Sequence, residues 1–66
     1  MNEEEIITAA SYCLMKGLDY ETMRYSDYMY GNEKLMDRVW DYVEEAQEDG
    51  FKAFRIKYSH VKLCAF

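Results

Sequence analysis

A row of carboxylates in the second half of the chain has the spacing of one helix face. Its members, four, three and four residues apart, are Asp37, Asp41, Glu44 and Glu48, with Glu45 beside them. Side chains three or four residues apart are neighbours on a helix, and like charges four apart destabilise it by about 0.2–0.5 kcal/mol per pair. Helix stability does not favour such a row, so it predicts an anionic surface that attracts a basic partner.

Two other interpretations of this row stay open. The first is a solvated helix face, neutralised in part by Lys34, Arg38 and the cations near the C-terminus. The second is an imitation of DNA. Acids three or four residues apart on a helix repeat every ~5.5 Å, whereas one DNA strand carries a charge every ~3.4 Å. The row is therefore a sparse imitation of DNA unless other acids extend it, namely Asp19, Glu21 and Asp27.

Residues 20–30 are unusually rich in tyrosine. Four of these eleven residues are tyrosines, Tyr20, Tyr25, Tyr28 and Tyr30, and two more are methionines. Tyrosine adds a large contact area at a low cost in conformational entropy, so it is favoured in binding surfaces. The alternative is that most of these rings pack against neighbouring helices. We assign to the expected binding surface, besides the carboxylate row, Asp27, Tyr25, Tyr28 and Tyr30.

The charges of the chain are strongly segregated. All thirteen acidic residues lie between Glu3 and Asp49, where four cations leave a local charge of −9. The last sixteen residues carry four cations and no acid. Local fields, more than the net charge, decide what a surface attracts. The cationic end either packs against the acidic helices or binds separately, and the sequence leaves both open.

Residues typical of catalytic and metal sites are too few to predict either kind of site. His60 falls in an expected turn without a nearby acid, and Cys13 lies on an expected apolar helix face. These two residues and Cys64 match no recognised spacing of zinc ligands, and no nucleophile or phosphate-binding motif is present. We therefore expect a protein without enzymatic activity, cofactor or metal.

The N-terminal half indicates a cytoplasmic protein. The first residues are acidic where a secretory signal needs basic ones. The longest uncharged stretch near them, residues 6–15, is too short to cross a bilayer. Two cysteines are fewer than a disulfide scaffold of this size uses. We expect reduced thiols, no membrane association and a single domain over residues 1–66.

Three helices are predicted, over about residues 3–16, 20–30 and 33–48. Apolar residues recur at the helical period in the first and third segments, and less regularly in the second. Each segment follows a residue suited to capping a helix, namely Asn2, Asp19 and Asn32. Each also precedes a glycine, the residue that commonly ends a helix in the left-handed conformation.

The last sixteen residues have the alternation of strands. Phe54, Ile56 and Tyr58 alternate with cations, and after residues 59–60 the alternation resumes with the opposite parity at Val61 and Leu63. A turn at residues 59–60 puts all these apolar side chains on one face of a hairpin. We therefore predict a β-hairpin over about residues 51–66, and an α+β fold of three helices followed by this hairpin.

The order of three helices and a hairpin resembles a minimal winged helix-turn-helix. Residues 17–23, Gly-Leu-Asp-Tyr-Glu-Thr-Met, are similar to the turn and second-helix opening of that family, and residues 32–46 occupy the position of its recognition helix. A recognition helix presents Arg, Lys, Asn or Gln to base edges, whereas this one presents acids. The resemblance therefore implies the fold, with protein binding in place of DNA reading.

Our first functional hypothesis is a non-enzymatic protein-binding inhibitor or adaptor. The carboxylate row and the tyrosines are expected to occupy a basic, nucleic-acid-binding surface of a larger protein, without direct contact to nucleic acid. In size and charge the chain resembles small acidic phage proteins that block restriction, CRISPR or polymerase machinery. The alternative is a winged-helix transcription regulator that binds DNA through Arg55, Lys57 and Lys62. A homodimer is compatible with either.

Overall fold

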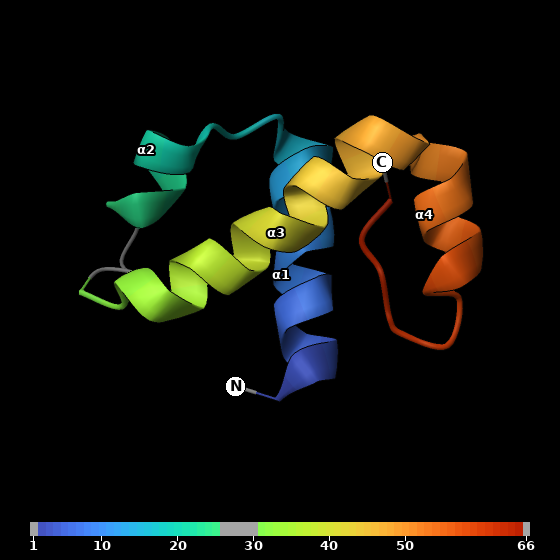
Figure 1. The fold of residues 1–66 in the computed structure, drawn as a ribbon, viewed down its shortest axis with the longest axis horizontal. Coiled ribbons are helices and arrows are strands. Elements are labelled where there is room, and N and C mark those ends of the chain that lie inside the picture. Colours follow the sequence, from blue (N-terminus) through green and yellow to red (C-terminus); the bar gives the residue numbers. More distant parts are fainter. Residues whose placement is uncertain (1, 26–30, 66) are drawn as a thin grey trace.

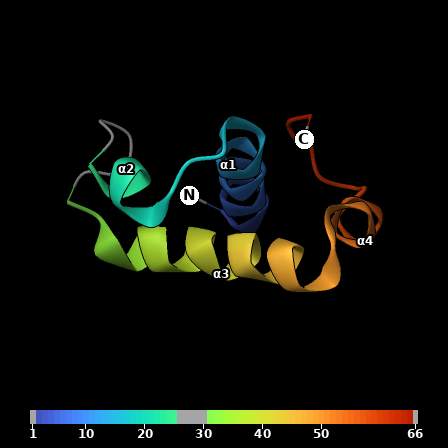
Figure 2. The same cartoon turned by 90° about the horizontal axis from the view of Figure 1, so that it is seen from above.

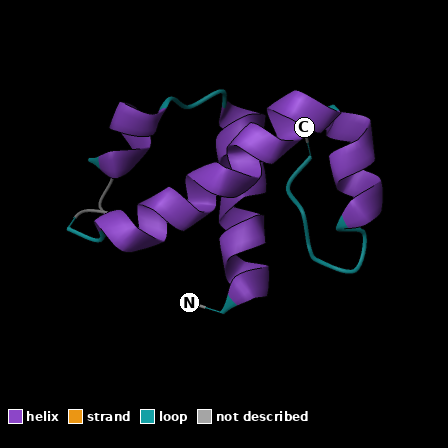
Figure 3. Ribbon diagram, in the orientation of Figure 1, coloured by secondary structure: helices purple, strands orange, loops and turns teal. Residues whose placement is uncertain are grey.

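The computed structural model describes residues 2–25 and 31–65, and these residues form four helices and no strand (Figure 1, Figure 3). In chain order the helices are α1 (Glu3–Lys16), α2 (Tyr20–Arg24), α3 (Glu33–Asp49) and α4 (Phe51–Lys57). The predicted α+β fold is therefore wrong, because the described chain is all-α. None of these four helices has both the length and the apolar composition needed to cross a membrane.

The longest helix, α3, is the element on which the others are arranged. α1 crosses α3, α2 lies beside its N-terminal half, and α4 follows its C-terminal end (Figure 1). A view turned by 90° shows α1 and α2 on the same side of α3, while the described chain leaves the opposite side uncovered (Figure 2). One face of α3 is therefore exposed along most of the helix.

The predicted starts of α1, α2 and α3 are confirmed by the residues that cap them. The side chain of Asn2 accepts a hydrogen bond from the Glu5 N–H at 2.8 Å, and Asp19 accepts one from the Thr22 N–H at 2.7 Å. Asn32 accepts one from the Leu35 N–H at 3.1 Å. Each bond satisfies an N–H that has no partner within its own helix.

The core lies where the apolar faces of α1, α2 and α3 meet. Its buried members are, in chain order, Ile6, Ala9, Ala10, Cys13, Met23, Met36, Val39 and Val43. A second cluster, of Ile7, Ala46, Phe54 and Val61, joins α1, α3, α4 and the C-terminal residues. The two clusters fix α1 and α4 against the inner side of α3, so within residues 2–25 and 31–65 neither cluster covers the outer side of α3.

The predicted hairpin is replaced by α4 and an irregular tail. Phe54 is buried and its ring packs on that of Tyr58, four residues later, at a centroid distance of 4.7 Å. Ile56, which a hairpin would bury beside them, is 67% exposed. The segment contains both periods, and the helical one prevails because Phe54 and Tyr58 together reach the core from one helix face.

The tail after α4 runs along α1 without forming a strand. The Cys64 N–H donates to the Ser11 hydroxyl at 2.9 Å, and the Thr8 hydroxyl donates to the Lys62 carbonyl at 2.8 Å. Val61 is buried in the second core cluster. Side chains of α1 thus supply the hydrogen bonds that a partner strand was expected to supply, and the described tail provides no wing for a winged-helix fold.

The ends of α2 and α3 differ from the prediction, and the predicted continuation of α2 to about residue 30 is wrong at Tyr25, where the helix has already ended. α3 reaches Asp49, one residue beyond the expected end, where Gly50 with φ of 97° separates it from α4. α2 is described over Tyr20–Arg24 with Tyr25 as its C-cap. The rest of the predicted second helix, residues 26–30, lies outside the described residues.

Candidate protein-binding face of the third helix

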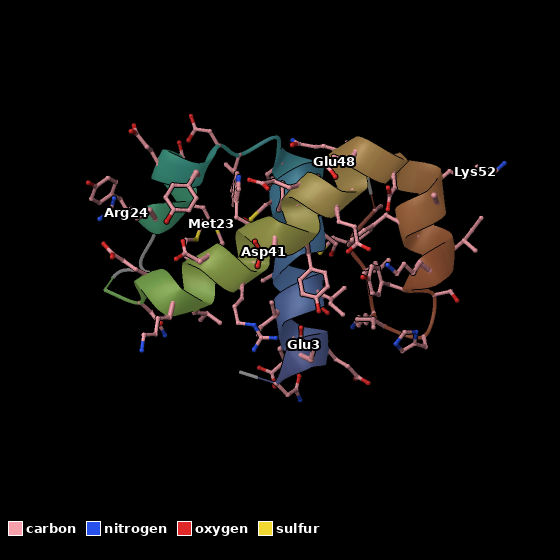
Figure 4. All side chains as sticks on the ribbon, in the orientation of Figure 1. Glu3, Met23, Arg24, Asp41, Glu48 and Lys52 are labelled. Carbon is pink, nitrogen blue, oxygen red and sulfur yellow. The ribbon has the colours of Figure 1, made fainter. Side chains whose placement is uncertain are left out.

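Three carboxylates of the predicted row share the outer side of α3. Asp41, Glu44 and Glu48 are exposed, and among the described residues none of them forms an ion pair or a hydrogen bond through its side chain. Asp41 and Glu48 point away from α1, on the side of α3 opposite its buried residues (Figure 4). These three residues are called the acidic face below.

Asp37 lies at the edge of this face and is bonded within the molecule. The Tyr20 hydroxyl donates a hydrogen bond to Oδ1 of Asp37 at 3.0 Å. The same ring meets Trp40 edge to face, with 5.5 Å between the ring centroids. The hydrogen bond to Asp37 raises the pKa of Tyr20 above its usual 10. Asp37 therefore helps to hold α2 on α3, while its exposed position continues the acidic face.

Glu45 belongs to the joint between α3 and α4. The Lys57 ammonium forms an ion pair with its carboxylate, and the Tyr58 hydroxyl donates to Oε2 at 2.7 Å. The hydrogen bond from Lys57, supported by the one from Tyr58, lowers the pKa of Glu45 below 4.5 against the opposing effect of partial burial. Glu45 therefore stabilises the contact between α3 and α4 and does not belong to the acidic face, although it is next to Glu44 in sequence.

Two arginines are paired with acids outside the acidic face. Arg38 forms an ion pair with Glu3, and Arg24 forms one with Glu33. The Tyr42 hydroxyl also donates to Glu3, and this bond is the main cause that lowers the pKa of Glu3 and raises the pKa of Tyr42 to about 12. Arg38, expected to neutralise the row in the solvated-face interpretation, is therefore engaged by α1.

The predicted tyrosine surface is described only in part. Tyr25 is 66% exposed at the end of α2, and the Arg24 guanidinium lies over its ring at 5.7 Å from the centroid. No contact between Tyr25 and the acidic face is present among the described residues. The other predicted members of this surface, Asp27, Tyr28 and Tyr30, lie outside the described residues.

The three cations of the alternative hypothesis are not brought together on a strand. Arg55 and Lys57 belong to α4, and Lys57 is paired with Glu45, while Lys62 lies in the tail. Sequence reasoning missed the outward side of α4, where Ile56 is exposed near Lys52. The spacing of Phe51, Phe54 and Tyr58, three and four residues apart, was the signal for this helix.

The groups considered for chemistry are dispersed. Cys13 and Cys64 are free thiols, and burial raises the pKa of the Cys13 thiol to about 11. In the described ranges no three side chains of His, Cys, Asp or Glu are placed to hold a metal ion. The His60 ring lies near that of Tyr58, tilted by 47° and with 6.5 Å between the ring centroids.

Comparison with profiles of known protein families, with curated proteins and with solved structures finds no match for this chain. Its own residues are therefore the basis of the functional proposal.

Proposed function

We propose that this chain is a non-enzymatic protein-binding inhibitor or adaptor whose acidic face occupies a basic surface on a larger protein. The observation that carries the proposal is the exposure of Asp41, Glu44 and Glu48 on the uncovered side of α3, without a cation paired to them among the described residues. Carboxylates that are not neutralised within a molecule steer and orient a cationic partner.

The length of the acidic face indicates how much basic surface it can cover. Seven residues separate Asp41 from Glu48, which is ~10 Å along a helix. One DNA strand carries about three or four phosphates over that length, at ~3.4 Å per phosphate. Three carboxylates over the same length suit a basic site that holds a few phosphates, and a long duplex-binding cleft requires more charge.

Nucleic-acid enzymes and DNA-binding defence or transcription proteins have basic sites of this kind. The resemblance in size and charge to small acidic phage proteins that block restriction, CRISPR or polymerase machinery makes such proteins the first partners to test. We propose a cytoplasmic location for the same reason, because these partners act on nucleic acid there. The winged-helix regulator is not retained, since the described tail of the chain contains no wing.

A capture experiment with charge-matched variants tests this function. Host-cell lysate is passed over the immobilised native chain and over two triple variants. The face variant is Asp41→Asn/Glu44→Gln/Glu48→Gln. The control variant, Glu4→Gln/Glu5→Gln/Glu21→Gln, removes the same three negative charges from exposed positions on α1 and α2.

We expect the native and control chains, but not the face variant, to retain the same protein, and salt to release it. The purified partner is then expected to bind a duplex DNA probe more weakly when the native chain is added. Equal retention on all three chains contradicts a role for the acidic face. Unchanged DNA binding in the presence of the native chain contradicts inhibition.

A further inference from the structure

The acid that pairs with Arg38 belongs to a different helix from the carboxylates of the acidic face. Glu3 is the first residue of α1, and its carboxylate contacts two side chains of α3 that are four residues apart. One oxygen, Oε2, pairs with the Arg38 guanidinium, and the other, Oε1, accepts a hydrogen bond from the Tyr42 hydroxyl. Figure 4 shows Glu3 at the first turn of α1, away from Asp41. Both oxygens of Glu3 are therefore engaged at the side of α3 that faces α1.

Arg38 is the cation of α3 that is spaced to pair with the acidic face. α3 contains two cations, Lys34 and Arg38. Arg38 lies three residues before Asp41, a spacing at which opposite charges on a helix pair. Lys34 lies seven residues before Asp41, which is ~10 Å along the helix and beyond that spacing. The position of the Arg38 guanidinium therefore decides whether a carboxylate of the acidic face is neutralised from within α3.

Two features hold the Glu3 carboxylate charged and in place. Tyr42 donates a hydrogen bond to it, and the Tyr42 ring packs edge to face on that of Tyr58, with 5.6 Å between the ring centroids. Glu3 also lies in the first turn of α1, where the helix dipole favours a negative charge. The side chains of Arg38 and Glu3 are 55% and 45% exposed, so their ion pair is weak by itself. Loss of the Glu3 carboxylate should therefore free Arg38.

We propose that Glu3 is a positioning residue for the acidic face, because with Tyr42 it holds Arg38 toward α1 and so leaves Asp41 unpaired. This inference deepens the proposed function and rests on it, since unpaired carboxylates are what orient a basic partner. Without the Glu3 carboxylate, the Arg38 guanidinium turns to Asp41, three residues along the helix, and neutralises it. A residue of α1 thus sets the charge that the outer side of α3 offers to a partner.

NMR of the arginine side chains tests the position of Arg38 without any partner. Asp41→Asn is introduced into the native chain, into Glu3→Gln and into Glu4→Gln, and the Nε–H signal of Arg38 is compared before and after this change. Glu4→Gln is the control, since it removes the same charge from the neighbouring residue, whose side chain has no ion pair among the described residues. Arg38→Gln assigns the signal, and far-UV circular dichroism establishes that each variant is folded.

We expect Asp41→Asn to shift the Arg38 signal much more in the Glu3→Gln background than in the native and Glu4→Gln backgrounds. That result means that Arg38 pairs with Asp41 only when Glu3 has lost its charge. Equal shifts in all three backgrounds overturn the inference, because Glu3 then does not hold Arg38. An unshifted signal in all three overturns it as well, because Arg38 then does not turn to Asp41.

Binding to the captured partner tests the consequence for the acidic face. Glu3→Gln should bind about twofold more weakly than Glu4→Gln, because it neutralises one of three carboxylates whose joint removal is expected to cost about tenfold. Adding Arg38→Gln to Glu3→Gln should restore the native affinity, because it removes the freed cation and returns the net charge to its native value. A shifted Arg38 signal with equal affinities supports the hold of Glu3 on Arg38 and contradicts the proposed function, so the two proposals can fail separately.

Discussion

The Tyr58 hydroxyl donates a hydrogen bond to Oε2 of Glu45 at 2.7 Å. This bond and the Lys57 ion pair direct one carboxylate of α3 toward α4. Asp41, Glu44 and Glu48, on the same helix, have no such partner among the described residues. Glu45 thus maintains the fold, whereas Asp41, Glu44 and Glu48 are available to a partner.

Substitutions at the joint between α3 and α4 should lower stability. Tyr58→Phe removes the hydroxyl donor and Glu45→Gln removes the ion pair, and each should lower the free energy of unfolding by about 1 kcal/mol. The double variant should cost less than the sum, because Tyr58→Phe removes the hydrogen bond that Glu45→Gln weakens by taking the charge from its acceptor. Urea unfolding monitored by circular dichroism measures all three. If the double variant loses as much stability as the two single variants together, the contact between Tyr58 and Glu45 is contradicted.

The pH dependence of stability should change with Glu45. The pKa of this carboxyl is lower in the folded chain than its usual 4.5, mainly because Lys57 hydrogen-bonds to it. The stabilisation is therefore complete above the unfolded pKa and is lost as the pH falls through the folded pKa. The native chain should exceed Glu45→Gln in stability at pH 6, and the difference should shrink below pH ~4. A difference that is constant with pH contradicts this role.

Tyr42 should ionise only at a pH well above the usual tyrosine pKa of 10. The hydrogen bond from its hydroxyl to Glu3 raises the pKa of Tyr42 to about 12, because the nearby carboxylate opposes a phenolate. Substitution of Glu3→Gln should lower this pKa toward 10. A titration of tyrosine ring carbons by NMR measures the change, with Tyr42→Phe assigning the signal. If the pKa of Tyr42 is unchanged in the Glu3→Gln variant, the Tyr42 hydroxyl has another partner.

The parts of the fold that depend on local signals could be predicted from the sequence. Asn2, Asp19 and Asn32 each cap a helix as expected, because a cap needs only the residues of one turn. The conformation of residues 51–57 depends instead on tertiary contacts. Phe54 and Tyr58 fit both a strand and a helix, and the packing of Phe54 on Ala46 and Ile7 decides for the helix.

The candidate site was predictable in position but not in the roles of its members. The spacing of the acids placed Asp41, Glu44 and Glu48 on one face of α3. The sequence did not separate Glu45 from them, because Lys57 and Tyr58 reach it only through the turn at Gly50. The exposure of Ile56 was missed for a related reason, since a hairpin would have buried this side chain.

The two cysteines should differ sharply in reactivity. Burial raises the pKa of the Cys13 thiol to about 11, so a very small fraction is thiolate at pH 8. Cys64 is only half-buried, near the end of the tail. A colorimetric thiol reagent at pH 8 should modify one thiol per chain quickly in the native state and both in concentrated guanidinium. The Cys64→Ser variant should lose the fast reaction, and a fast reaction that persists contradicts the burial of Cys13.

The dissociation constant of the captured partner, measured against salt concentration, tests the acidic face most directly. Native chain, face variant (Asp41→Asn/Glu44→Gln/Glu48→Gln) and control variant (Glu4→Gln/Glu5→Gln/Glu21→Gln) are compared by calorimetry from low to high NaCl. We predict that the face variant binds at least about tenfold more weakly at low salt, or ~1.4 kcal/mol, and with a shallower salt dependence, while the control binds like the native chain. Equal affinities and equal salt slopes for all three chains would contradict the proposed function.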